Sequence, residues 1–63
     1  MEMDEIKADL EFCIGRRDMA QRSADLAASQ GHLFDVGVYL DSVNGWNDLI
    51  DTLTTEINKE TAK

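Results

Sequence analysis

The chain has 63 residues and a net charge of −7, from 13 acidic and six basic side chains. One cysteine excludes an intrachain disulfide, and one cysteine with one histidine excludes an ordinary zinc site, so neither can support the small core of so short a chain. The negative charge argues against direct binding of nucleic acid or of an anionic membrane, and no apolar run approaches the ~20 residues of a membrane span.

The first helix is predicted over residues 3–29. Asp4 and Glu5 suit its N-terminus, where the helix dipole favours anions. One face of this helix includes Arg17, has Cys13 and Ala20 at its edge, and is otherwise apolar: Met3, Ile6, Leu10, Ile14, Ala24 and Ala28. This face is expected to pack on a second helix.

A second apolar row on the same helix consists of Phe12, Met19 and Leu26, spaced by seven residues and placed roughly 160–180° from the first face. Two interpretations are open. In the first, which we favour, the helix is apolar on two opposite sides and the row needs a further partner. In the second, Gly15 breaks or rotates the helix and merges the two lines into one core face.

The turn is predicted at about 30–34, with Gly31 as the left-handed residue that ends the first helix. Asp35 is a plausible N-cap of the second helix. Leu33 and Phe34 then lie before that helix and are expected to pack as a lid over the end of the hairpin. So short a connection makes the two helices antiparallel neighbours.

The second helix is predicted at about 35–59. Its apolar line has Tyr39, Trp46 and Leu53 at its flanks and consists of Val36, Leu40, Val43, Ile50 and Ile57. Asn44-Gly45 is a turn signal, but the apolar line keeps its phase across it, so we expect a continuous helix. Lys59 and Lys63 near the C-terminus suit the helix dipole there.

Residues suited to catalysis are scarce, and we predict no enzyme, no cofactor and no metal site. Cys13 is expected to be a small core residue and His32 a solvated turn residue. Asp48 and Asp51 lie one turn apart on the polar side of the second helix, which is the usual pattern of a solvated surface.

Charged residues are unevenly distributed. Four basic residues lie in the first helix: Lys7, Arg16, Arg17 and Arg22. No basic residue occurs from Ser23 to Asn58. Three interpretations are open. The first is ion pairs between the helices of one chain, and the second is ion pairs between subunits. The third is an anionic ligand such as a nucleotide, held between copies by Arg16 and Arg22 with Tyr39 or Trp46 stacking on its base.

The sequence thus predicts one all-α domain over residues 1–63, an antiparallel two-helix hairpin that forms a homo-oligomer, with a dimeric four-helix bundle as first choice. The expected function is a small acidic cytoplasmic binding protein, a regulator or inhibitor of the kind that bacteria, plasmids and phages encode, which binds another protein through helical faces. The expected interface residues are Phe12, Met19, Leu26, Tyr39 and Trp46. One alternative is a nucleotide- or anion-sequestering oligomer; another is a nucleic-acid mimic with Asp41, Asp48 and Asp51 on its acidic face.

Overall fold

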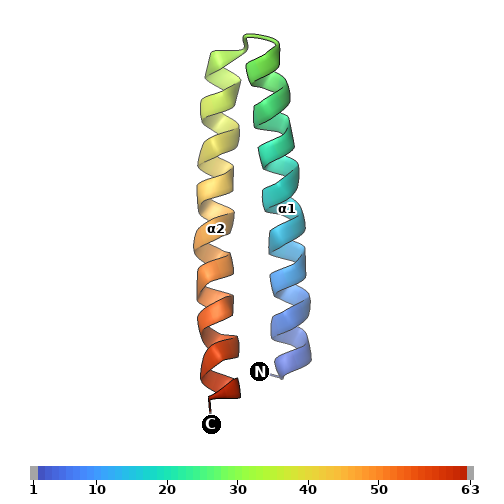
Figure 1. Ribbon diagram of the computed structural model, residues 1–63, viewed down its shortest axis with the longest axis vertical. Helices are drawn as coiled ribbons and strands as arrows, with labels where there is room; N and C mark the ends of the chain where they lie inside the picture. Colours follow the sequence, from blue (N-terminus) through green and yellow to red (C-terminus); the bar gives the residue numbers. More distant parts are fainter. Residues whose placement is uncertain (1, 63) are drawn as a thin grey trace.

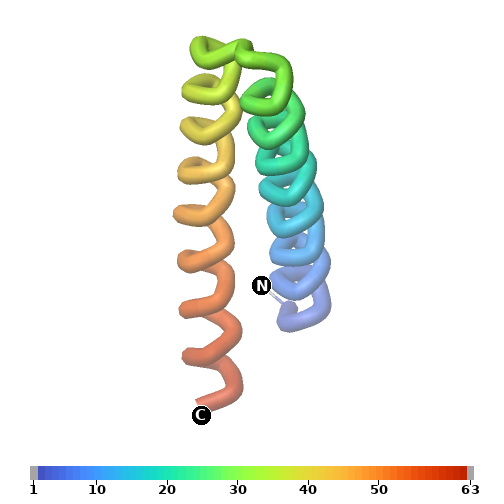
Figure 2. The backbone as a smooth tube through the Cα atoms, turned by 45° about the horizontal axis from the view of Figure 1, so that its top comes forward, coloured from blue at the N-terminus to red at the C-terminus, as the bar shows by residue number. Residues whose placement is uncertain are grey.

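The computed structural model describes residues 2–62, which form two antiparallel helices, α1 (Met3–Ser29) and α2 (Leu33–Thr61), joined by a short turn (Figure 1). The two helices stay side by side when the molecule is tilted (Figure 2). The prediction of an all-α hairpin is confirmed. α1 has its predicted bounds, whereas α2 begins two residues before and ends two residues after the predicted 35–59; Lys63 lies outside the described residues.

The turn is built by backbone hydrogen bonds around Gly31, whose φ of 76° is in the left-handed region. The His32 N–H donates to the Ala27 carbonyl oxygen at 2.9 Å, and the Gly31 N–H donates to that of Ala28 at 3.1 Å. This pair of bonds is the Schellman motif, which satisfies carbonyl groups at the end of a helix. The predicted role of Gly31 is confirmed.

α2 begins earlier than predicted, and this changes the positions of Asp35, Leu33 and Phe34 relative to the start of the helix. His32 is the N-cap, while Asp35 lies in the first turn with its Oδ2 4.0 Å from the His32 Nδ1, so the prediction of Asp35 as N-cap is wrong. Leu33 and Phe34 belong to the helix and are 77% and 84% exposed. The predicted lid is also wrong, because no further element among residues 2–62 crosses this end of the hairpin for them to pack against.

The seam between the helices follows the three-then-four spacing of a coiled coil. In α1 the side chains at this spacing are buried or half-buried: Met3, Ile6, Leu10, Cys13, Arg17, Ala20, Ala24 and Ala27. In α2 the buried or half-buried side chains at the same spacing are Val36, Val43, Trp46, Ile50, Leu53 and Ile57.

This spacing corrects the predicted core at several positions. Ala28 is exposed, and its predicted place in the core is taken by Ala27, while Cys13 is buried instead of lying at the edge. Leu40, predicted on the central line of α2, is exposed, whereas Trp46 at the flank is half-buried. The cause is that a stripe projected at 100° per residue drifts by ~20° per heptad from the seam that two packed helices share.

Both helices are continuous through their glycines. α1 passes Gly15 and α2 passes Asn44-Gly45 without interruption, so the rejection of a turn at Gly45 is confirmed and the merging of two lines at Gly15 does not occur. The hairpin extends over 49 × 14 × 14 Å, so it is a single layer of two helices. Within residues 2–62, neither helix has both the length and the apolar character needed to cross a membrane.

Candidate interaction surface

Phe12 of α1 and Trp46 of α2 meet across the hairpin. Their ring centroids are 6.1 Å apart and their planes are inclined by 80°, which is an edge-to-face contact. Arg16, one turn along α1, places its guanidinium carbon 5.5 Å from the centroid of the Phe12 ring. Aromatic pairs prefer this arrangement, and a guanidinium is attracted to a ring face, so the three side chains form one contact group on one side of the hairpin.

The next residue of α2 reaches α1 on the other side. Asn47 follows Trp46 by one residue, and therefore by about 100° around the helix. Its Oδ1 accepts a hydrogen bond from Nη1 of Arg17 at 3.4 Å, and Arg17 also pairs with Asp18 at 3.1 Å. The hairpin thus has two distinct sides, one marked by Phe12 and Trp46, the other by Arg17 and Asn47.

The side marked by Phe12 and Trp46 is apolar along α1. Phe12, Met19 and Leu26 recur every seven residues, so they lie in one line, and they are 59%, 58% and 59% exposed. Because Phe12 touches Trp46, this row flanks the seam. The exposure of the row agrees with the interpretation of a second apolar side.

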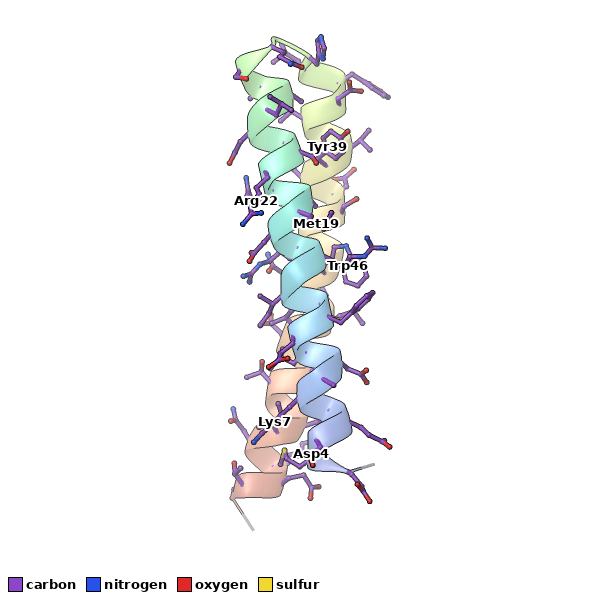
Figure 3. All side chains as sticks on the ribbon, turned by 90° about the vertical axis from the view of Figure 1, so that its right-hand side faces the viewer. Asp4, Lys7, Met19, Arg22, Tyr39 and Trp46 are labelled. Carbon is purple, nitrogen blue, oxygen red and sulfur yellow. The ribbon has the colours of Figure 1, made fainter. Side chains whose placement is uncertain are left out.

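α2 continues this side. Tyr39 lies two turns before Trp46, and Leu49 lies one turn after it. Val38 lies three turns before Leu49 and shares its direction. Figure 3 shows Tyr39 and Trp46 projecting to one side of the hairpin and Arg22 to the other. We call this side the apolar face; except for the half-buried Trp46 its members are exposed, and they are Phe12, Met19, Leu26, Val38, Tyr39, Trp46 and Leu49.

The structure therefore brings all five predicted interface residues onto one face and adds two more. Val38 and Leu49 were not among the predicted residues, although the one-turn spacing from Trp46 to Leu49 was available in the sequence. The sequence does not indicate which side of α2 lies next to Phe12. The contact between Phe12 and Trp46 identifies that side.

The three arginines are not brought together. Arg16 lies over Phe12 at the edge of the apolar face, and Arg17 is engaged with Asp18 and Asn47 on the other side. Arg22 projects away from Tyr39 and Trp46 (Figure 3). The predicted anion site for Arg16 and Arg22 lies between copies of the chain, so it stays a prediction.

The predicted acidic face is a solvated outer surface of α2. Asp41, Asp48 and Asp51 are all exposed. The backbone carbonyl oxygens of Asp48 and Asp51 accept hydrogen bonds from the hydroxyls of Thr52 and Thr55, at 3.0 and 2.9 Å. These bonds occupy main-chain groups and leave the carboxylates facing solvent.

Groups capable of chemistry lie apart. Cys13 is buried in the seam, whereas His32 is exposed at the turn beside Asp35. Among residues 2–62 no three His, Cys, Asp or Glu side chains gather in a way that could hold a metal ion, and no pocket is found there. The apolar face offers packing surface, so binding to a complementary surface is what this arrangement supports.

A comparison with protein-family models found no match, and searches of curated proteins and of solved structures found no significant match.

Proposed function

We propose that this chain is a non-catalytic binding protein, a small acidic regulator or inhibitor that acts by docking its apolar face on protein helices. The observation that carries the proposal is the size of that face relative to the core. Seven large apolar side chains form the face, whereas the buried apolar residues are five, two of them alanines. Soluble monomers rarely leave a large contiguous apolar patch exposed, and such patches commonly mark protein interfaces.

The composition of the face supports the same proposal. Phe12, Tyr39, Trp46 and Met19 are residue types enriched in the centres of protein interfaces, where a few aromatic anchors supply most of the binding energy. Arg16 at the edge belongs to the same enriched set. Charged side chains are depleted at such centres, and Arg16 lies beside the Phe12 ring at the edge of this face.

The charge of the outer surface bears on the kind of partner. The net charge of −7 favours association with proteins whose surfaces are basic and disfavours acidic partners. We place the activity in the cytoplasm, where the single thiol of Cys13 stays reduced.

The test replaces two members of the apolar row with carboxylates. The variant Phe12→Glu with Met19→Glu is compared with the control Gln21→Glu with Ala28→Glu, which adds the same charge to α1 at the same spacing of seven, about 160° around the helix from the apolar row. Gln21 and Ala28 are both exposed. Circular dichroism establishes that both variants remain helical.

We expect the control to keep every protein interaction of the parent chain, including self-association, and the Phe12 and Met19 variant to lose them. The measurement is retention of binding proteins from an extract of the source cells on immobilised parent, variant and control chains, together with the mass of each chain in solution. The proposal is wrong if the Phe12 and Met19 variant self-associates and retains the same proteins as the parent.

A further inference from the structure

We infer that the apolar face is covered by a second copy of this chain, in a two-fold symmetric four-helix bundle with the two turns at opposite ends. The inference rests on the proposed function, because it names a second copy of the chain as the partner that docks on the same apolar face. Three observations carry it: the surface that the hairpin leaves exposed, the pattern of side chains along the face, and the distribution of charge along the hairpin.

The single hairpin exposes more surface than a compact protein of its mass. It exposes 4655 Å², against about 4100 Å² expected of a folded monomer of 7.1 kDa. Its radius of gyration is 14.5 Å, against about 11 Å for a compact domain of 63 residues. The excess arises because the molecule is one helix pair thick, and a second pair laid on the apolar face removes it.

The area available matches that of a stable dimer. Two separate copies expose twice 4655 Å², and a compact protein of twice the mass exposes about 6800 Å², so pairing buries about 2500 Å² in total. Permanent homodimers bury about 2000–5000 Å². A short peptide covers less of a 49 Å face than a second hairpin of equal length does.

The pattern along the face suits a two-fold axis that crosses it near Met19. Phe12 and Leu26 lie seven residues on either side of Met19. When α1 lies antiparallel on α1 of the second copy, Met19 meets its counterpart and Phe12 lies over Leu26 of the other chain. On α2 the axis passes near Gly45, where a Cβ has no non-local heavy atom of the described residues within 4 Å, so the two α2 helices have room to approach.

The charge distribution decides the orientation. The half of the hairpin that holds the termini, residues 2–15 and 48–62, carries nine acidic side chains and two lysines, a net charge of −7. The half that holds the turn, residues 16–47, carries four acidic side chains and three arginines, a net charge of −1. If the two turns lay at the same end, the two halves with a net charge of −7 would lie together and repel each other. With the turns at opposite ends, each of these halves lies beside a half with a net charge of −1, so the repulsion is smaller.

The experiment has two parts. Sedimentation equilibrium of the unmodified chain at micromolar concentrations gives the mass in solution, and the same measurement is made on the Phe12→Glu, Met19→Glu variant and on the Gln21→Glu, Ala28→Glu control. Orientation comes from the distance between two nitroxide labels on Gln30→Cys in a Cys13→Ala background, measured by pulsed electron resonance, with helicity checked by circular dichroism.

We expect a mass of about 14 kDa, twice the 7.1 kDa chain mass, for the parent and the control. Because the Phe12 and Met19 variant buries four carboxylates in the paired face, its dissociation constant should rise by at least about 100-fold. The two labels should lie more than half of the 49 Å hairpin length apart.

A mass of 7.1 kDa or of three or more chains overturns the inference, as does a dimer that survives in the Phe12 and Met19 variant. A dimer with its labels closer than half the hairpin length overturns the orientation. If the parent is monomeric but binds another protein that the variant does not bind, the proposed function stands and the second copy is not the occupant.

Discussion

Arg17 donates a hydrogen bond from Nη1 to Oδ1 of Asn47 at 3.4 Å, and this contact places a cation at a seam position between α1 and α2. The neighbours of Arg17 in the seam are Cys13 and Ala20, which are small, so the long stem of the arginine fills space between the helices while its head reaches solvent. Its pairing with Asp18 is largely exposed and contributes little to stability.

Arg17→Leu is therefore expected to stabilise the fold. Leucine keeps the apolar contact of the stem and fixes fewer rotatable bonds than arginine, so the free energy of unfolding should rise by about 1 kcal/mol. Arg17→Ala should lower it, since the stem is lost with the charge. Urea denaturation followed by circular dichroism, at one protein concentration for all chains, measures both changes. A loss of stability in Arg17→Leu equal to that in Arg17→Ala would show that the polar contact outweighs the packing.

The two alanines at positions 24 and 28 test the corrected seam. Ala24 is 2% exposed, whereas Ala28 is exposed, although the sequence pattern placed both in the core. Ala24→Leu should cost about 1–3 kcal/mol, because three extra heavy atoms have no room between the helices. Ala28→Leu should change the free energy of unfolding by no more than about 0.5 kcal/mol. Equal losses in the two variants would contradict the seam described here; the measurement is thermal and urea unfolding of each.

Gly31 and Gly15 differ in what their backbones require. Gly31 has a φ of 76°, which an alanine adopts only at a cost of about 1 kcal/mol, so Gly31→Ala should destabilise the chain by that amount. Gly15 lies inside α1 with open space around it, and Gly15→Ala should stabilise the chain by up to about 1 kcal/mol through helix propensity. If both substitutions changed the free energy of unfolding in the same direction, the turn at residues 30–32 would not depend on the left-handed backbone of Gly31.

The hairpin itself was predictable because each of its determinants is local. Apolar periodicity marks both helices, Gly31 marks their junction, and the absence of proline removes any forced break. The register of the seam was not predictable in the same way. It depends on the shared spacing of two packed helices, which is why Ala27 is buried in place of Ala28 and Cys13 is buried instead of lying at the edge of the face.

The residues of the candidate site likewise divide into those that the sequence predicted and those that it missed. Phe12, Met19 and Leu26 were found from their spacing alone, since a row of large apolar side chains on one helix is visible in the sequence. Val38 and Leu49 were missed because their membership depends on which side of α2 faces this row. Leu33 and Phe34 were misplaced for a related reason: a lid over the turn needs a surface to cover, and two helices provide none at that end.

The contact between Phe12 and Trp46 should be measurable as a coupling energy. Replacing each residue with leucine, singly and together, isolates the edge-to-face interaction from loss of apolar area. Such pairs contribute about 0.5–1.5 kcal/mol beyond burial, and the exposure of Phe12 favours the lower part of this range. The four unfolding free energies of the cycle provide the value. Additive losses would mean that the two rings act independently and that the apolar face is less ordered across the helices.

The salt dependence of self-association distinguishes apolar pairing from pairing by ions. Each copy carries a charge of −7, so two copies repel, and the screening length falls from ~30 Å at 0.01 M salt to ~8 Å at 0.15 M. If the apolar face holds the dimer, its dissociation constant should fall roughly three- to tenfold over this range. The Gln21→Glu, Ala28→Glu control has two further negative charges, so its dissociation constant should fall more steeply with added salt. If Arg16 and Arg22 of one copy instead pair with carboxylates of the other, added salt should weaken the dimer. Dilution series followed by sedimentation at several salt concentrations measure the slope, and a dissociation constant that rises with salt contradicts apolar pairing.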